Sequence, residues 1–459
     1  MFFTRNRIVV LESGKYQLKP TVNKYQKSLM APRTSSWPAW SNLQSTDKNT
    51  RSVDSWLNAR RKEEGAEGLW RVHDGLYDLH EWIHKHPGGP QWLTITKGTD
   101  VTELFESYHV NGEAVTQVLR KFYVRQANTP RMSPFTFKPD GFYNVLKSRV
   151  AKKLAYTNST TSKLKTILVV DILILIAMLL CAEAGRRNSY FVAVLAGTVL
   201  ALGLVGSHNF THLKDNWRMY YIQLGLMSIR EWRISHVLSH HIYTNTVQDL
   251  EMTLLYPFLH WYPTKDKPWN VVWFSKLTPI VYPFITFYLS VLRTITLNND
   301  KADCLAFVIP MILMFSGNLS LNSVLCMWLL IIASMNMVFT FIGFHAAHHH
   351  PDNFHDGDEV SEQDVDWGIH QTDCCSERHE IGNSLLISMV TFGDHSLHHL
   401  FPALDHGMIP HVQDVFEETC KEFEIDLTPK PYGEYVRGQF EQLVRMNPNK
   451  PRRSKISAN

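Results

Sequence analysis

Long apolar runs in this chain begin after residue 165, whereas the residues before that point change polarity over short intervals. Residues 166–182 and 190–206 are each 17 residues long, near the lower limit of ~17–25 residues for a helix that crosses a membrane. Between positions 147 and 165 there are six basic residues and no acidic one. This heavier basic flank predicts that the N-terminal side of the first run faces the cytosol and that the two runs form a hairpin.

Three more apolar stretches follow, at residues 271–292, 304–315 and 322–344. The middle one has only 12 residues and contains Pro310, so we expect it to be re-entrant or interfacial. Four spanning helices then remain. With an even number of crossings between them, the histidine groups before and after these stretches would face the same side of the membrane. Asp171, inside the first run, is costly in lipid, so we expect it to have a protein partner or to lie at the interface.

The region before the first run has the pattern of a small soluble domain. Residues 1–55 are polar and predict a flexible lead-in, in which Trp37 and Trp40 could dock. Residues 69–79 alternate apolar and polar side chains around Gly75, as a hairpin does. His86 then begins the sequence His-Pro-Gly-Gly, a turn with almost no side-chain bulk, which permits a flat macrocycle to approach the backbone.

A second histidine, His109, follows His86 by 23 residues. Two imidazoles on opposite sides of a haem iron leave no open position for oxygen, so such a domain carries electrons. Residues 56–127 resemble cytochrome b5 in the hairpin, the His-Pro-Gly-Gly turn, the second histidine and a closing Lys-Phe-Tyr-Val. The resemblance implies a small α+β domain that binds haem b with His86 and His109 as axial ligands.

Acidic residues gather beside His109, and residues 100–113 contain no Lys or Arg. Two interpretations stay open: a rim of one sign that docks a basic redox partner, or an ordinary solvated acidic face. The acidic residues are Asp100, Glu103, Glu106 and Glu113.

Composition narrows the class of protein. The formal net charge is only +3, so nothing suggests a nucleic-acid partner. The six cysteines have no CxxC spacing and do not form a disulfide framework, which favours a reducing compartment. The chain has 23 histidines, and most of those beyond residue 200 stand in tight groups beside apolar runs, a pattern typical of metal binding.

Four histidine groups lie near predicted membrane boundaries. In the first, His208 and His212 are four residues apart and share one face of a helix. Neutral imidazoles ligate iron, zinc or copper, and iron is favoured because the chain also carries an electron donor, whereas zinc has no redox chemistry. The other groups are His236, His240 and His241; His345, His348, His349 and His350; and His395, His398 and His399.

The order HxxxH, a three-histidine second box, and HxxHH before Leu-Phe-Pro resembles the membrane fatty acid desaturase superfamily over residues 130–425. The resemblance implies an all-α integral membrane domain whose two irons activate O2 and remove hydrogens from an acyl chain. It implies that further ligands come from His370 or from the group of His345, His348 and His349, and it does not decide between them. Matched to the boxes, the iron ligands would be His208, His212, His236, His240, His241, His395, His398 and His399.

Two positions depart from the usual family pattern. The second box is HxxxHH rather than HxxHH, which moves its first imidazole by one position and makes His236 the least certain ligand. The last box begins with His395, where front-end desaturases usually have Gln, so their regiospecificity does not carry over. Both departures keep metal-binding side chains.

The resemblance as a whole implies an oxygen-dependent fatty acyl desaturase that receives electrons from NADH through cytochrome b5 reductase and its own haem domain. The substrate would be a fatty acyl lipid or acyl-CoA, and the haem domain and histidine boxes would face the cytosol at the endoplasmic reticulum. An acyl hydroxylase with the same cofactors and an inactive, membrane-anchored electron carrier remain alternatives. The expected division is a lead-in at 1–55, haem domain at 56–127, linker and basic segment at 128–165, membrane domain at 166–403 and cytosolic tail at 404–459.

Overall fold

The computed structural model describes residues 35–41, 43, 45, 52–253, 255, 259–265, 267–296, 298–360, 365–382 and 384–451. Most of the predicted lead-in lies outside these residues. Trp37 and Trp40, the latter in η1 (Pro38–Trp40), are buried, and their rings pack 5.8 and 5.6 Å from that of Phe135. The docking considered for these two tryptophans is therefore present, because the two indoles bury apolar area against the body of the protein.

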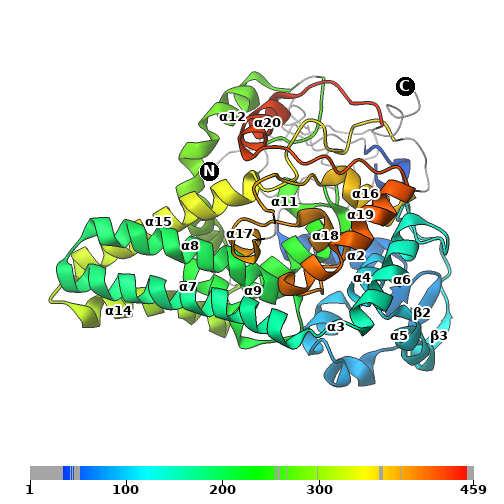
Figure 1. Cartoon of the computed structure of the whole chain (residues 1–459), viewed down its shortest axis with the longest axis horizontal. Helices are drawn as coiled ribbons and strands as arrows, with labels where there is room; N and C mark the ends of the chain where they lie inside the picture. The colour runs from blue at the N-terminus through cyan, green and yellow to red at the C-terminus, as the bar shows by residue number, and fades with distance from the viewer. Residues whose placement is uncertain are drawn as a thin grey trace, which may run out of the picture.

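The N-terminal domain is built on a small antiparallel sheet in the order β1-β2-β3, at the lower right of Figure 1. The predicted hairpin is present, with Trp70 opposite Tyr77, and the buried side chains of Trp70 and Leu76 anchor it in the core. The elements are α2 (Val53–Glu63), β1 (Trp70–Val72), β2 (Gly75–Tyr77), η2 (His80–Lys85), α3 (Pro90–Thr96), α4 (Thr102–Tyr108), α5 (Gly112–Leu119), η3 (Arg120–Phe122) and β3 (Tyr123–Gln126).

The chain between this domain and the first apolar run is fastened to the C-terminal half. β4 (Phe135–Thr136) pairs in parallel with β5 (Val365–Asp366), more than two hundred residues away. α6 (Phe142–Ala155) then packs against α19 (Gln413–Glu422). The predicted linker thus holds the two halves together through backbone pairing and helix packing.

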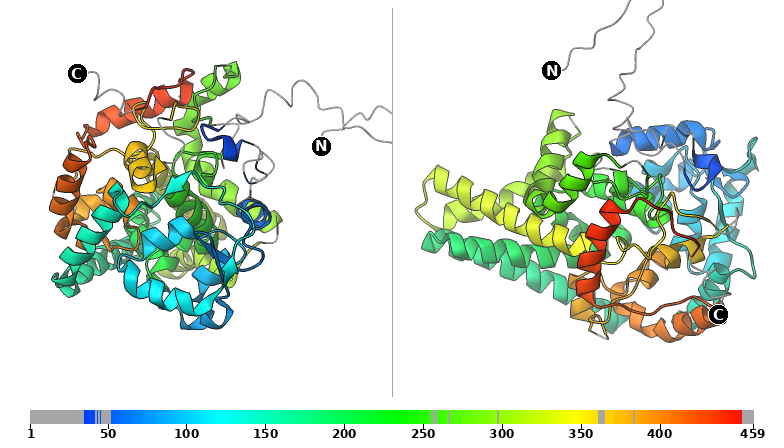
Figure 2. Two further views of the ribbon diagram at one scale, coloured as in Figure 1. Left: turned by 90° about the vertical axis from the view of Figure 1, so that its right-hand side faces the viewer. Right: turned by 90° about the horizontal axis from the view of Figure 1, so that it is seen from above.

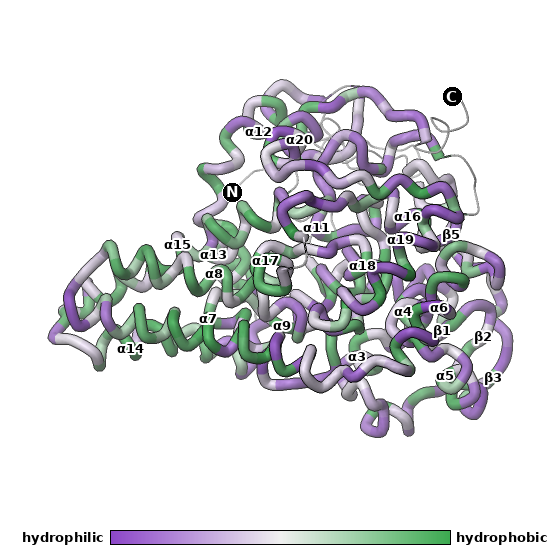
Figure 3. The backbone as a smooth tube through the Cα atoms, in the orientation of Figure 1, coloured by the Kyte–Doolittle hydropathy of each residue, from purple (hydrophilic) through white to green (hydrophobic). Residues whose placement is uncertain are grey.

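A bundle of apolar helices extends to one side of the molecule in Figure 1, and Figure 3 shows that hydrophobic residues predominate along these helices. Among the described residues, four helical segments are long and apolar enough to cross a membrane, in agreement with the expected number. These four segments are Thr160–Arg187, Tyr190–His212, Trp269–Ile295 and Leu321–Phe344. The bundle elements are α7 (Thr160–Arg187), α8 (Tyr190–His212), α12 (Trp269–Val281), η6 (Tyr282–Phe284), α13 (Ile285–Ile295), η7 (Lys301–Phe307), α14 (Val308–Ser316) and α15 (Leu321–Phe344).

The segment formed by α12, η6 and α13 bends at its centre, where Pro283 lies in η6. Tyr282 packs 5.4 Å from the ring of Phe344, at the end of α15 that leads into a histidine group. Arg293 forms an ion pair of 2.9 Å with Glu231, just before the second histidine box. The bend and the far end of this segment therefore lie near the histidine end of the bundle.

The 12-residue stretch expected to be re-entrant follows a different course. Asp303 in η7 lies 3.2 Å from Arg293, at the histidine end, whereas Ser316 lies against Gly185 near the opposite end of α7. A 3₁₀ segment followed by an α-helix over residues 301–316 covers roughly 27 Å, close to the apolar thickness of a bilayer. These contacts correct the assignment: η7 and α14 run the length of the bundle, and the bent α12–α13 segment is the better interfacial candidate.

Asp171, in the first apolar run, has protein partners as expected. Arg218 donates to its carboxylate at 2.8 and 3.0 Å, and the hydroxyl of Tyr221 donates at 3.0 Å. Both donors belong to η4 (Trp217–Gly225), which follows α8. The carboxylate therefore joins the loop that carries the first histidine group to α7.

Short helices between and after the long ones form the histidine-rich body of the protein. The expected tail after residue 403 is part of this body where it is described, because α19 packs on α6 and α20 packs on α12, as the views in Figure 2 also show. These helices are α9 (Ile229–Trp232), η5 (Arg233–His240), α10 (His241–Tyr243), α11 (Leu250–Thr253), α16 (Trp367–Cys374), α17 (Leu385–Val390), α18 (His395–Leu400), η8 (His406–His411) and α20 (Tyr432–Val444).

The N-terminal domain docks directly on this body through its His-Pro-Gly-Gly turn. Gly89 has a φ of +104°, and a Cβ atom there would overlap the carboxylate of Asp215. The backbone N–H of Asp215 donates to the carbonyl of Gly88 at 3.1 Å, and its carboxylate pairs with Arg233 at 2.6 Å. The guanidinium of Arg233 in turn lies 4.1 Å from the ring of Trp92. Gly89 is thus required by the domain contact as well as by its own backbone conformation.

We predict that Gly89→Ala destabilises the chain more than Gly68→Ala. Both glycines have positive φ, but a Cβ at Gly68 would meet open space, so only Gly89→Ala adds an overlap to a backbone strain of about 1–3 kcal/mol. The measurement is the apparent unfolding temperature of the two purified variants in detergent. Equal shifts for the two variants would contradict the close domain contact.

Candidate metal and haem sites

A cavity of about 480 Å³ opens between the imidazoles of His86 and His109 in the N-terminal domain. The two ring centroids are 6.3 Å apart. Two metal–nitrogen bonds of about 2 Å, with half a ring on each side, would span roughly 6 Å. Apolar side chains make up most of the wall, including Leu93, Phe105 and Val118. The cavity therefore fits an iron between two imidazoles in a flat apolar macrocycle.

Hydrogen bonds to the backbone fix the orientation of both rings. The Nδ1–H of His86 donates to the carbonyl of Gly89 at 3.1 Å, and that of His109 donates to the carbonyl of Phe105 at 2.9 Å. Each Nε2 is left free to act as a ligand. Burial lowers the pKa of His109 to about 4, so that ring is neutral, as ligation requires.

Three of the four acidic residues beside His109 are paired within the chain and do not form the exposed rim considered above, whereas Glu113 is exposed. Asp100 and Glu103 are buried, and both pair with Arg131, at 2.8 and 2.6 Å. Glu106 pairs with Lys147 of α6 at 2.7 Å. The sequence alone could not show this, because the two cations come from positions after the acidic segment and reach it only through the fold.

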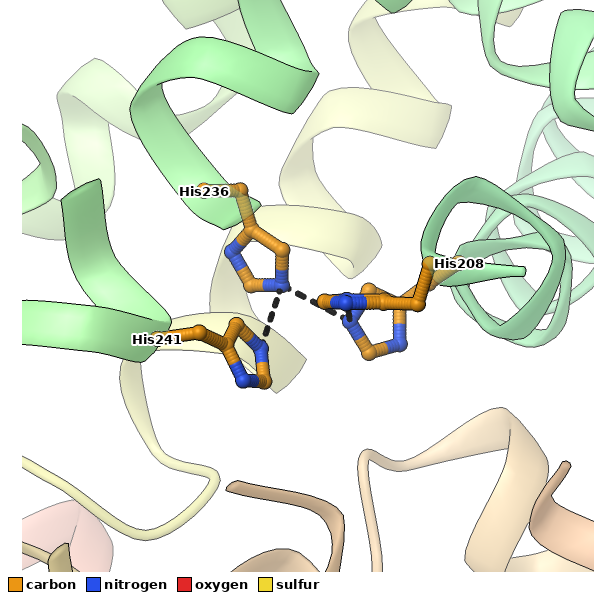
Figure 4. Close-up of side chains that lie close together, drawn as sticks. His208, His236 and His241 are labelled. Carbon is orange, nitrogen blue, oxygen red and sulfur yellow. Dashed lines mark hydrogen bonds between the residues drawn. The ribbon is translucent and has the colours of Figure 1, made fainter. Parts of the chain in front are cut away.

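Four buried histidines, His208, His212, His236 and His241, form what we call the first cluster. The ring nitrogens converge, since the Nε2 of His208 lies 2.7 Å from that of His236 and 2.8 Å from that of His212. Figure 4 shows His208, His236 and His241 with their rings turned toward one another. The end of α8 supplies two of the four rings, and the second histidine box supplies the other two.

The second box owes its geometry to a π-helix, η5, which covers Arg233–His240. The N–H of His241 donates to the carbonyl of His236, five residues back, as in a π-helix. This spacing puts His236 and His241 on one face, with their Nε2 atoms 3.1 Å apart. The extra residue of HxxxHH is thus absorbed by the wider turn, and His236, the least certain ligand from sequence, lies in the first cluster.

A second cluster consists of His240, His348, His395 and His399. The Nε2 of His348 lies 2.6 Å from that of His395 and 3.1 Å from that of His240. The ring of His399 stacks on that of His241 with centroids 3.9 Å apart, so the two clusters are adjacent.

The Nδ1 atoms of the second cluster all bond to acceptors outside it. Two acceptors are side chains: Asp249 holds His240 at 2.8 Å, and Gln371 holds His399 at 3.1 Å. The other two acceptors are backbone carbonyls: His348 donates to that of Cys374 at 3.1 Å, and His395 donates to that of Phe392 at 3.1 Å. Each ring therefore presents Nε2 to the centre, and the buried Nε2 of His399 has no hydrogen-bond partner.

His398 and His406 complete the site beside the first cluster. They group with His208, and the Nε2 of His398 lies 3.2 Å from that of His208. His406 begins η8, and its Nδ1–H donates to the side-chain carbonyl of Asn209 at 3.0 Å. His406 lies beyond position 403, so the site draws on the segment that was expected to be a separate tail.

The donor set fits two transition-metal ions. Ligands at about 2.0–2.1 Å from one metal lie roughly 3 Å from one another, as the Nε2 atoms here do. Burial lowers the pKa of His241, His395 and His399, which keeps these rings neutral. For His240, burial is outweighed by Asp249 and Glu251, which raise its pKa to about 9. These carboxylates also make the ring a stronger donor to a metal.

Three of the histidines proposed as iron ligands from sequence belong to none of the groups that could hold a metal. The Nε2 of His345 bonds to Gln439 at 2.9 Å, and the ring of His349 stacks on Trp261 with centroids 3.6 Å apart. His370 donates to the carbonyl of Thr244 at 3.0 Å. Of the group left undecided, only His348 is brought to the other boxes.

Sequence reasoning missed His406 and the residues that orient the rings. Asp249 and Glu251, which bonds to the Nδ1 of His236 at 2.7 Å, follow the second box by a few residues, and this acidic pair was the available signal. Gln371 and His406 had no local signal, because only the folded chain brings them to the site.

Comparisons with known proteins agree with this geometry. The profile described as "Fatty acid desaturase" matches residues 189–430, and the one described as "Cytochrome b5-like Heme/Steroid binding domain" matches residues 55–128. No solved structure matches the chain.

Among curated proteins, the chain is 38% identical to "Cytochrome b5-related protein" of Drosophila melanogaster over 87% of this chain and 93% of that protein. It is 24% identical to "Delta(5) fatty acid desaturase A" of Dictyostelium discoideum, over 84% and 92% of the two chains. With both profiles in place and the histidine boxes converging as described, the chain belongs to the fatty acid desaturase family and carries an N-terminal cytochrome b5-like domain.

Proposed function

We propose that this protein desaturates a fatty acyl chain in an oxygen-dependent reaction at a di-iron centre, with electrons supplied through its own haem domain. One observation carries the proposal. Two adjacent sets of buried imidazoles present Nε2 atoms roughly 3 Å apart, beside a pocket built for a haem with two imidazole ligands. A redox-inert structural metal would not need an electron carrier next to it.

The residues have distinct roles in this proposal. The first cluster, with His398 and His406, would hold one iron, and the second cluster would hold the other. Two bound irons supply the means to activate O2 and to accept electrons singly. Glu251, Asp249 and Gln371 orient the rings of His236, His240 and His399 and keep the Nε2 atoms of these three rings directed inward. The histidines of both clusters, Asp249 and Gln371 are buried, which excludes water from the metal ligands.

The proposal extends to location and partners. The haem domain and both clusters lie at one end of the apolar bundle, which favours a cytosolic face at the endoplasmic reticulum membrane. A flavin-containing cytochrome b5 reductase would pass electrons from NADH to the haem, since a cytochrome of this kind carries one electron at a time. The substrate would be a fatty acyl lipid or acyl-CoA, whose alkyl chain suits a site beside the bilayer.

We expect His348→Ala to lose iron and His349→Ala to keep it. The two residues are neighbours in the chain, His348 is buried and His349 is partly buried against Trp261, but only His348 belongs to a cluster. Iron per chain is measured by elemental analysis after purification under conditions that retain about two irons in wild type. Equal iron contents in the two variants would contradict the assignment of the second cluster.

For the haem site, His86→Ala and His109→Ala should each abolish the haem absorbance of the purified chain. His84→Ala should leave it unchanged, because His84 is exposed and lies in η2 just before the ligand turn. Retention of a full haem spectrum by either ligand variant would rule out ligation by both imidazoles.

Lipid profiling tests the reaction itself. A desaturase-deficient host that expresses the wild-type chain should contain a new unsaturated acyl species. The species should be absent with a variant that combines His398→Ala and His399→Ala, because the second cluster then loses His399 and the first cluster loses the neighbouring ring of His398. A hydroxylated product would replace the proposal with the hydroxylase. No new lipid from a chain loaded with haem and iron would favour an electron-transfer protein.

A further inference from the structure

The haem pocket is not closed by the N-terminal domain alone. His212, Leu213 and Lys214, at the end of α8, line the same cavity as His86 and His109. Ala403, which follows the last histidine box, lines it as well. A haem in this pocket would therefore lie against the metal-binding half of the chain, and His212 is at once a wall of the haem pocket and a member of the first cluster.

One hydrogen bond joins the two redox sites. Tyr108 immediately precedes His109 in the chain, and its hydroxyl lies 2.9 Å from the Nδ1 of His212. The Nε2 of His212 lies 2.8 Å from that of His208, inside the first cluster. With Nε2 directed to a metal, the Nδ1–H of His212 donates to the oxygen of Tyr108. A continuous path of bonds and one hydrogen bond thus leads from His109 to the first cluster.

The second cluster has no comparable link among the hydrogen bonds of the described residues. Its four Nδ1 atoms bond to Asp249, Gln371 and the carbonyls of Cys374 and Phe392, all in the C-terminal half. In the described part of the chain, the first cluster alone has a member that contacts the haem domain in this way. The haem domain is therefore linked by a hydrogen bond to the first cluster and not, among the described residues, to the second.

The domain contact holds the Tyr108 hydroxyl in place. The Tyr108 ring packs on that of Trp92 with centroids 5.8 Å apart, and Trp92 is covered by Arg233. On the other side of the contact, Arg60 donates to the hydroxyl of Tyr243 at 2.8 Å. With these buried contacts on both sides, the bridge between Tyr108 and His212 does not depend on a transient encounter between separate proteins.

We propose that electrons pass from the haem to the iron of the first cluster by way of Tyr108 and His212, which makes this iron the entry point of the di-iron centre. The inference rests on the proposed function, since it requires haem and iron at the two sites. In each passage one ferrous haem becomes ferric and one ferric non-haem iron becomes ferrous. Two passages, each preceded by reduction of the haem by an NADH-dependent flavin reductase, deliver the two electrons of a turnover. Tyr108 itself is neither oxidised nor consumed and serves as a positioning residue.

The test compares Tyr108→Phe with Tyr143→Phe in the full chain loaded with haem and ferric iron. Phenylalanine keeps the ring of Tyr108 but removes its bond to His212. Tyr143 is a matched control, because its hydroxyl also joins the two halves, through the carbonyls of Leu400 at 3.1 Å and Glu106 at 3.3 Å. It bonds to no imidazole of either cluster in these contacts.

The measurement is made without substrate or oxygen, so it does not depend on the desaturation reaction. The haem is reduced rapidly with a flash-generated small-molecule donor, and its reoxidation by the ferric centre is followed by the change in haem absorbance. Iron per chain and the haem midpoint potential are determined for each variant. We expect Tyr108→Phe to slow haem reoxidation several-fold or more at unchanged potential and iron content, and Tyr143→Phe to match wild type.

Each other outcome overturns the route. Equal rates in wild type and Tyr108→Phe would mean that electrons do not use this bond. Equal slowing in both variants would assign the effect to domain docking in general. Loss of iron from Tyr108→Phe would assign its hydroxyl to holding the ring of His212. Failure of the proposed function would be distinct, because it appears as the absence of a new lipid while haem reoxidation in wild type persists.

Discussion

The arrangement of this protein depends on one constraint: many imidazoles, most of them neutral, must be buried together with their ring nitrogens converging. Uncharged rings lose less on burial than charged ones, but each ring still has a proton that needs an acceptor. The structure supplies acceptors on the outside of the clusters, such as Asp249 for His240 and Glu251 for His236. In these rings Nδ1 is bound on the outside, so Nε2 faces inward. The packing of the two clusters therefore depends on the hydrogen bonds that surround them.

The elements around the site follow from that constraint. His208 and His212 lie one helical turn apart at the end of α8, so an ordinary α-helix serves for them. His236 and His241 are five residues apart and require the wider π-helix. The same π-helix leaves His240 free to turn toward the second cluster. One short segment thus supplies imidazoles to both clusters.

The N-terminal domain is integrated with the metal site rather than attached as a separate carrier. Acidic residues that could have formed an exposed docking rim instead pair with Arg131 and Lys147 of the same chain. Gly89 permits Asp215 to approach the haem turn, and Tyr108 reaches His212 across the contact. Tethering and direct contact together replace an encounter between two proteins by an intramolecular one.

The sequence by itself determined the parts of this protein, because local patterns encode them: the hairpin, the two haem-facing histidines, the long apolar helices and the histidine boxes. Only the tertiary structure decided which parts meet. His348 joins the second cluster while its neighbour His349 stacks on Trp261, and His406 reaches the site from far along the chain. The short stretch containing Pro310 runs along the bundle because Asp303 and Ser316 contact opposite ends of it. Length and hydropathy describe one segment at a time, whereas these outcomes depend on contacts between segments distant in sequence.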